Sequence, residues 1–174
     1  FYVPIATRLG LNRMRLDLED LGFVAWYPMR SQVLSEALKK ARGNRSEIVQ
    51  KIQSSIEGRL HQEGLIGDVT GREKHLYSIY RKMQRKGVPF QQFYDIRAIR
   101  VITDTVPDCY RILGIGHGLW QPIPGEFDDY IATPKANMYQ SLHTAFICKD
   151  GKTLEVQIRT REMHRIAEYG VAAH

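Results

Sequence analysis

The sequence has little cysteine and no long apolar run, and these absences narrow the class of protein. Cys109 and Cys148 stand alone and form no CxxC pair, so we expect neither a thiolate metal site nor a redox site. A reducing, cytoplasmic setting is the simplest prediction. No stretch of 18 apolar residues is present, which predicts no membrane span, and no signal peptide is recognisable. We therefore expect no membrane partner.

From its two ends, we expect this sequence to be part of a longer protein. It begins at Phe1 without an initiator methionine and stops at His174 inside a helical pattern. Its 174 residues, 43% hydrophobic and 25% charged, are ordinary for a globular domain with a core of its own.

The positive charge is concentrated in one stretch of the chain. Residues 71–100 contain eight Lys or Arg and two acids, so this stretch alone carries the formal net charge of +6 of the whole chain. Charge gathered in one place predicts an anionic ligand rather than a generally basic surface.

Hydrophobic periodicity predicts an α+β fold, a mixed β-sheet flanked by helices with a helical N-terminal segment. Helices are expected over 7–28, from Ser31, from Ser46, over 73–86 and over 161–174, and strands over 65–71, 93–103 and in a hairpin over 141–160. Two apolar stripes are predicted to pack in the core: Leu11, Met14, Leu18 and Leu21, and then Ile48, Ile52, Ile56 and Leu60. We divide the chain into a helical part, 1–64, and an α/β core, 65–174.

A basic helix is the first candidate site. Arg72 stands where a strand gives way to this helix, whose polar side carries Lys74, Ser78 and Lys82. The N–H groups and the dipole at a helix N-terminus favour phosphate, so the junction predicts a polyphosphate site. A solvated basic helix face is the alternative.

Two acids in predicted strands are the second candidate site. Asp95 opens one strand, and Glu155 lies inside another with Gln157 and Arg159 on the same face. A strand glutamate is costly unless it is paired or bound to metal. An ion pair of Glu155 with Arg159 or a lysine is one reading, and a Mg²⁺ site formed by Asp95 and Glu155 is the other.

The polar segment 128–144, DDYIATPKANMYQSLHT, is the third candidate site. Lys135 offers a charge for phosphate, Asn137 an amide for a base edge and Tyr139 a flat ring for stacking. His143 offers a hydrogen bond or a proton. A two-residue turn at Asp150-Gly151 would place His143 on the opposite face from Glu155, which weakens a direct catalytic role for the histidine. The segment predicts a nucleotide pocket.

Four segments in order resemble the synthetase domain of the RelA/SpoT family of alarmone enzymes. They are GREKHLYSIYRKM, FYDIRAIRVI, PGEFDDYIATPKANMYQSLHT and LEVQIRTREMHRIAEYGVAAH. The similarity runs from about Tyr2 to His174, and the first helical residues resemble the connector that follows the family's hydrolase domain. The resemblance implies a nucleotidyltransferase-like fold.

The resemblance also implies an activity. The family moves the β,γ-pyrophosphate of ATP to the 3′-hydroxyl of GDP or GTP, releases AMP and so makes (p)ppGpp for the stringent response. Carried over by motif, the ATP phosphates would be held by Arg72, Lys74 and Lys82, with Ser78 on the same helix face. Mg²⁺ would be held by Asp95 and Glu155, and Glu155 would accept the proton of the attacking hydroxyl. The guanine nucleotide would contact Lys135, Asn137, Tyr139, His143 and Gln157.

An acidic segment separates subgroups of the family. Glu126 and Asp128 stand where bifunctional members usually carry a basic pair. The acidic version resembles the synthetase-only subgroup and implies GTP in preference to GDP. In the full-length protein the resemblance implies an adjacent hydrolase-like domain, a C-terminal regulatory region and possible contact with the ribosome.

Two other functions fit part of the pattern. A non-catalytic RNA- or ribosome-binding module would use the basic stretch but has no need of acids in its strands. A general nucleotidyltransferase would share the acids and cations but would not account for the Tyr139 loop.

Overall fold

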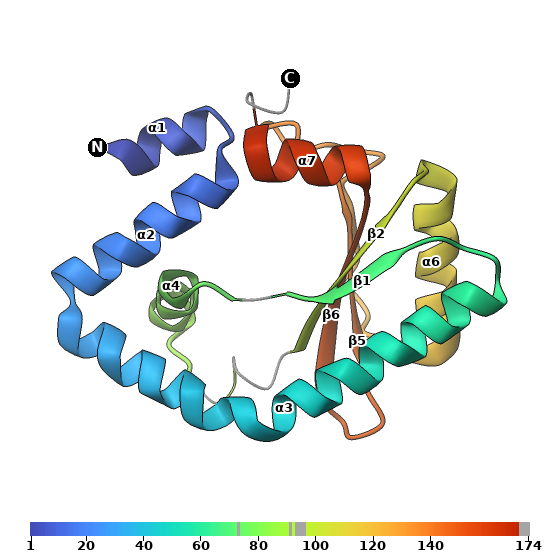
Figure 1. Cartoon of the computed structure of the whole chain (residues 1–174), viewed down its shortest axis with the longest axis horizontal. Coiled ribbons are helices and arrows are strands. Elements are labelled where there is room, and N and C mark those ends of the chain that lie inside the picture. The colour runs from blue at the N-terminus through green and yellow to red at the C-terminus, as the bar shows by residue number, and fades with distance from the viewer. Residues whose placement is uncertain (73, 91, 93–96, 171–174) are drawn as a thin grey trace.

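The computed structural model describes residues 1–72, 74–90, 92 and 97–170 (Figure 1). The helices are α1 (Tyr2–Arg8), α2 (Asn12–Trp26), α3 (Pro28–Gln62), α4 (Leu76–Lys86), α6 (Val106–Leu119) and α7 (Arg161–Tyr169). The strands are β1 (Asp68–Gly71), β2 (Arg97–Thr103), β3 (Gln121–Pro122), β4 (Asp128–Asp129), β5 (Leu142–Ile147) and β6 (Thr153–Thr160).

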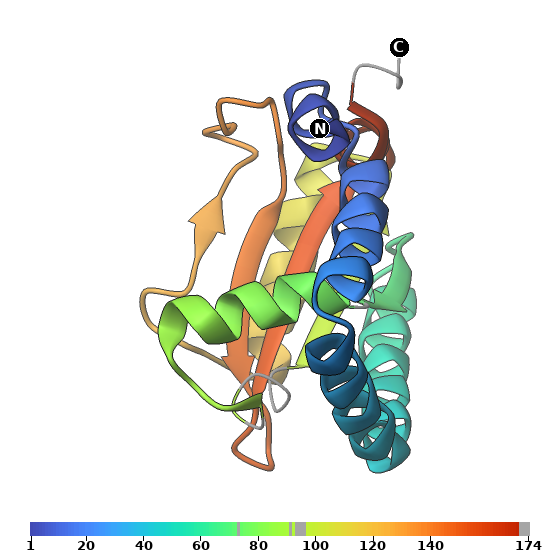
Figure 2. The same cartoon turned by 90° about the vertical axis from the view of Figure 1, so that its left-hand side faces the viewer.

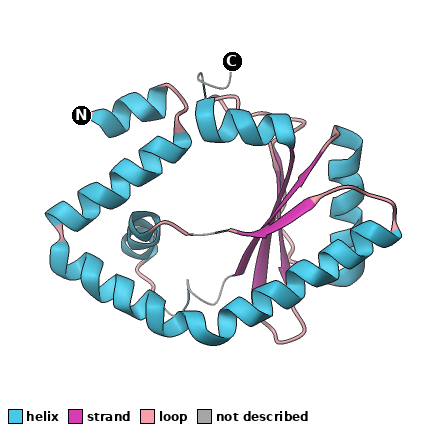
Figure 3. Ribbon diagram, viewed as in Figure 1, coloured by secondary structure: helices cyan, strands magenta, loops and turns pink. Residues whose placement is uncertain are grey.

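The strands form one mixed sheet in the order β1-β2-β6-β5-β3, with β4 also paired to β5. Only β2 and β6 are parallel, while β1, β3, β4 and β5 each run antiparallel to a neighbour. The mixed sheet and the flanking helices confirm the predicted α+β class (Figure 3).

One face of the sheet carries the main hydrophobic core. Ile99, Val156 and Ile158 alternate inward and are almost fully buried, as period-two patterning requires. The C-terminal half of α3 and α6 cover this face (Figure 1), and α3 contributes Ile52 and Ile56 to the core. The predicted core role of the stripe that contains Ile52 and Ile56 is confirmed.

The N-terminal helices differ from the prediction in two ways. The first helix is split at Gly10, whose φ of +68° ends α1, whereas the two helices expected from Ser31 and Ser46 are one 35-residue helix. Ser31 lies inside that helix, which begins at Pro28, and its hydroxyl donates to the Pro28 carbonyl, 2.8 Å away. The helix begins at Pro28 and not at Ser31, because proline is favoured in the first turn of a helix.

The predicted core role of the first apolar stripe is wrong for two of its members. Met14 and Leu21 are 55% and 68% exposed, and Phe23 is the residue of α2 that is buried. Phe23 packs with Leu34 of α3 and Ile79 of α4 in a second, smaller hydrophobic cluster. Figure 2 shows α4 lying across the molecule beside α2.

The β5–β6 hairpin has a different register from the predicted one. A three-residue loop, 149–151, joins the strands, and Gly151 adopts φ +76°. The Cys148 N–H donates to the Lys152 carbonyl across the loop. A third loop residue shifts the pairing by one position, and such a shift exchanges the two faces of a strand. His143 therefore pairs with Gln157 and lies on the same face as Glu155.

No described helix combines the length and apolarity that a membrane crossing demands.

Candidate active site

A row of polar side chains crosses the sheet on the face away from the main core. Asp128, His143, Gln157, Arg100 and Thr70 stand directly opposite one another on five neighbouring strands. Directly paired residues share one face, so the hairpin correction moves His143 into this row. The candidate residues His143 and Gln157 are thus neighbours.

Glu155 lies two residues from this row, between two small side chains. Its partners across the strands are Ala98 on β2 and Ala145 on β5, which leave space above the carboxylate. Lys74 is close enough for the Glu155 charge to raise its pKa, but burial is the larger effect and lowers the Lys74 pKa to about 8. Lys74 is therefore an electrostatic neighbour of Glu155, and both readings of Glu155, the ion pair and the Mg²⁺ site, stay predictions.

One buried arginine, Arg159, and one half-buried arginine, Arg100, make this face strongly cationic. Arg159 is 2% exposed and lies 3.3 Å from Glu168 and 2.7 Å from His164, so its partner is not Glu155. Arg100 shares Glu168 at 3.7 Å. Burial is the largest effect and lowers the pKa of both guanidinium groups. The positive charge of Arg72 lowers both further, and that of Arg159 also lowers the pKa of Arg100. One carboxylate between two arginines leaves positive charge available to an anionic ligand.

The predicted nucleotide loop is built around the Tyr139 ring. The Tyr139 hydroxyl and His143 Nε2 share a 2.8 Å hydrogen bond, and Lys135 Nζ lies 5.5 Å from the ring centroid. The guanidinium of Arg159 lies 5.8 Å from the same ring. Lys135 Nζ is closer still to Tyr130, at 4.2 Å. Cation–π contacts of this kind fix the ring in place beside the polar row.

The loop also fixes its own backbone. Asn137 Oδ1 accepts from the Tyr139 N–H at 3.2 Å, and the Met138 N–H donates to the Lys135 carbonyl at 2.8 Å. Met138 adopts φ +64°, a conformation that costs a side-chain-bearing residue about 1–2 kcal/mol. The loop is held in one conformation by its hydrogen bonds despite this strain.

His143 is neutral at physiological pH. Burial, together with the positive charge of Lys135, lowers its pKa to about 4. A neutral imidazole can donate or accept a hydrogen bond but carries no charge that would neutralise phosphate.

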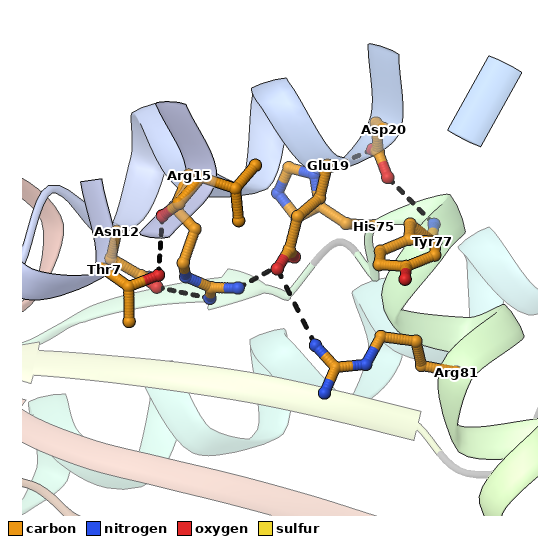
Figure 4. Close-up of polar contacts among 9 residues, drawn as sticks. Thr7, Asn12, Arg15, Glu19, Asp20, His75, Tyr77 and Arg81 are labelled. Atoms are coloured by element: carbon orange, nitrogen blue, oxygen red, sulfur yellow. Dashed lines mark hydrogen bonds and ion pairs between the residues drawn. The ribbon is translucent and has the colours of Figure 1, made fainter. Parts of the chain in front are cut away.

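The N-terminus of α4 is already occupied by a carboxylate. Asp20 of α2 accepts the Tyr77 N–H at 2.8 Å and lies 3.0 Å from His75 Nδ1 (Figure 4). Next to it, Glu19 lies 3.7 Å from Arg81 on α4. The sequence predicted that phosphate would use this helix end, but Asp20 caps it. A phosphate there would be held by side chains instead.

The remaining predicted residues lie where they can serve a phosphate chain, with one exception. Ser78 and Lys82 are on α4, and Lys82 is close enough to lower the Lys74 pKa. Arg72 follows β1, and its backbone N–H donates to Ala98. Asp95 lies outside the described residues.

Mg²⁺ fits the chemistry of Glu155. Among the described residues no three His, Cys, Asp or Glu side chains gather as a metal-binding group. Mg²⁺, however, commonly takes one or two carboxylates and completes its shell with water and substrate phosphates. A single glutamate between two alanines suits that mode of binding.

Sequence reasoning missed three functional candidates. Arg100 is one, although the alternation along β2 could have placed it opposite Gln157. The others are Asp20, which caps α4, and Asn12, which lines a cavity beside residues 137–139; both lie far from these neighbours in sequence.

Solved structures share this fold. The small alarmone synthetase 1 of Bacillus subtilis, bound to its product pppGpp, matches with a TM-score of 0.58 and 22% identity over 74% of this chain and 76% of its own. A GTP pyrophosphokinase family protein of Streptococcus pneumoniae matches with a TM-score of 0.53 and 25% identity, over 75% and 70%. The predicted nucleotidyltransferase-like fold is confirmed.

Sequence comparison places the chain in a family. Residues 71–174 match the family described as "Region found in RelA / SpoT proteins", and the chain belongs to it. The bifunctional (p)ppGpp synthase/hydrolase SpoT of Escherichia coli is 55% identical over 173 residues, 99% of this chain and 25% of that protein. A GTP pyrophosphokinase of Myxococcus xanthus is 47% identical, over 99% and 23%. The chain spans about a quarter of these relatives.

Proposed function

We propose that this chain transfers pyrophosphate from ATP to the 3′-hydroxyl of GTP or GDP and releases AMP. The observation that carries the proposal is Glu155, which lies between Ala98 and Ala145 on a cationic sheet face next to the Tyr139–His143 pair. The matched relatives named GTP pyrophosphokinase support it.

The donor half of the site is cationic. Arg72, Lys74 and Lys82, with Ser78 beside them, would hold the triphosphate of ATP between α4 and the sheet. Phosphoryl-type transfer depends on positioning and charge neutralisation more than on covalent chemistry, which suits this set of side chains.

The acceptor half lies at the Tyr139 loop. The guanine base would stack on Tyr139 and lie near Asn137, while Lys135 would contact the 5′-phosphates. Neutral His143 and Gln157 would hydrogen-bond the ribose. These contacts would direct the 3′-hydroxyl toward Glu155, two residues along β6 from Gln157.

Glu155 would accept the proton of the attacking hydroxyl. General-base catalysis of this kind contributes about 10²–10⁴-fold to a rate. Mg²⁺, held by Glu155 and Asp95, would supply neutralisation of the charge on the transferred phosphates.

Several properties of the longer protein remain part of the proposal. They are an adjacent hydrolase-like domain, a C-terminal regulatory region, ribosome contact and a cytoplasmic location. The preference for GTP over GDP, which rests on Glu126 and Asp128, and the assignment to the synthetase-only subgroup are likewise proposed. The division at residue 64 also stays a prediction.

The test uses γ-labelled ATP, Mg²⁺ and either GTP or GDP, with products separated by chromatography. The wild-type chain should move label onto the guanine nucleotide, and Glu155→Gln should lose at least about 10²-fold in rate while still binding ATP. Glu57→Gln, at an exposed position of α3, is the matched control and should keep full activity.

Two results would count against the proposal. Transfer that persists in Glu155→Gln would remove the proposed base from the mechanism. Absence of transfer combined with tight, salt-sensitive RNA binding would favour the RNA-binding module.

A further inference from the structure

A cavity of about 360 Å³ lies between the N-terminal helices and the nucleotide loop. Asn137, Met138 and Tyr139 form one wall, the α1–α2 junction forms another, and α7 closes the third side. Its volume is in the range of small-ligand sites. Two residues proposed to contact the guanine base, Asn137 and Tyr139, line this cavity, so the first dozen residues lie beside the proposed base site.

The α1–α2 junction is fixed against the end of α7. A Cβ on Gly170 would lie 2.3 Å from the Leu9 carbonyl oxygen, and one on Gly10 would lie 3.2 Å from the Gly170 Cα. Both glycines have positive φ, +68° at Gly10 and +54° at Gly170. A side chain at Gly170 would not fit, so the junction packs directly against the backbone at the end of α7.

Asn12 is the amide on this wall, and its orientation is determined by a neighbour. Asn12 Oδ1 lies 2.7 Å from Arg15 Nη2, and Arg15 is held in turn by Glu19 at 2.8 Å (Figure 4). A guanidinium group has only donors, so the amide oxygen must face Arg15. The Asn12 NH₂ group is therefore directed away from Arg15 as a donor.

The cavity wall offers donors and no acids. Arg8 and Arg15 line it together with Asn12, and none of the described lining residues is Asp or Glu. Such a wall complements a base edge rich in acceptors. Guanine presents O6 and N7, both acceptors, on one edge, whereas adenine presents a donor amino group in place of O6.

We propose that Asn12 is a specificity-determining residue that donates to O6 of the acceptor guanine. This inference rests on the proposed function. A donor fixed at this point would hydrogen-bond O6 of guanine. The amino group of adenine is itself a donor, so ATP in the acceptor pocket would place two donors opposite each other without a hydrogen bond. The N-terminal helices would then help to keep the two nucleotides in their separate roles.

The test measures binding and transfer for GTP and for 2-aminopurine riboside 5′-triphosphate, which lacks O6 and the N1–H that accompanies it. The wild-type chain should bind GTP about tenfold or more tightly than this analogue, because the hydrogen bond to O6 is lost. In Asn12→Asp the Arg15 contact and the shape are kept but the donor to O6 is removed, so this ratio should fall.

Inosine triphosphate provides the internal control, because it keeps O6 and loses only the 2-amino group. Its affinity relative to the 2-aminopurine nucleotide should fall in Asn12→Asp, whereas its affinity relative to GTP should not change. Asn12→Ala should lower the GTP preference in the same direction. Thermal unfolding of the variants shows whether the fold is intact.

An unchanged ratio of GTP to the 2-aminopurine nucleotide in a folded Asn12→Asp would overturn the inference. So would equal binding of the two nucleotides by the wild-type chain. Failure of the proposed function looks different: label transfer would be absent with every acceptor, and the binding ratio would still report on Asn12.

Discussion

His143 should make the stability of this protein depend on pH in a defined window. Burial and Lys135 lower its pKa from 6.5 to about 4 in the folded chain, whereas the unfolded chain keeps the ordinary value. Between these two values unfolding takes up a proton. The free energy of unfolding therefore falls as pH falls from about 6.5 to about 4, and the contribution is fully present above pH 6.5.

The size of the effect follows from the shift. At about 1.4 kcal/mol for each pKa unit, neutral His143 contributes on the order of 3 kcal/mol that disappears by about pH 4. The assay is urea unfolding of the wild type and His143→Gln at several pH values from 7 to 4. Carboxylates titrate in both proteins, so the difference between the two curves isolates the histidine.

The control is His61→Gln, at an exposed position near the end of α3, which should follow the wild-type pH dependence. Imidazole resonances followed by NMR give the His143 pKa directly. The reasoning is refuted if His143→Gln and wild type lose stability in parallel, or if His143 titrates near 6.5 in the folded protein.

Two further predictions concern the surroundings of the site. Asp20→Ala should lower the free energy of unfolding by about 1 kcal/mol and speed hydrogen exchange at the first turn of α4, since the Tyr77 N–H loses its acceptor. Asp20→Asn keeps an acceptor and should lose less stability. Equal exchange in all three proteins would show that the cap is unimportant. Met138→Gly should stabilise the chain by about 0.5–1 kcal/mol in urea unfolding, because glycine adopts φ +64° without strain. A destabilised variant would mean that contacts of the Met138 side chain contribute more to stability than the backbone strain costs.

Local patterns were enough to predict most of the elements. The alternation along β6 placed Glu155 and Gln157 on one face, and the apolar spacing in the second half of α3 placed Ile52 and Ile56 in the core. These patterns repeat within a few residues, so they need no knowledge of tertiary contacts.

The sequence-based predictions failed where a single loop residue, or a contact between distant parts of the chain, determines the structure. A third loop residue in the hairpin reversed the face of His143, and the sequence Asp150-Gly151 does not distinguish a two-residue turn from a three-residue loop. The cap supplied by Asp20 lies 57 residues from Tyr77 along the chain, beyond any local signal.

The length of α3 has a consequence for the order of events on heating. This one helix, about 52 Å long, contributes Leu34 to the small cluster beneath α4 and Ile52 and Ile56 to the main core. The two clusters are buried separately, so the small one can melt while the sheet stays folded. The proposed transfer activity should then be lost before global unfolding, with Glu155 still in its strand and Lys82 displaced together with α4.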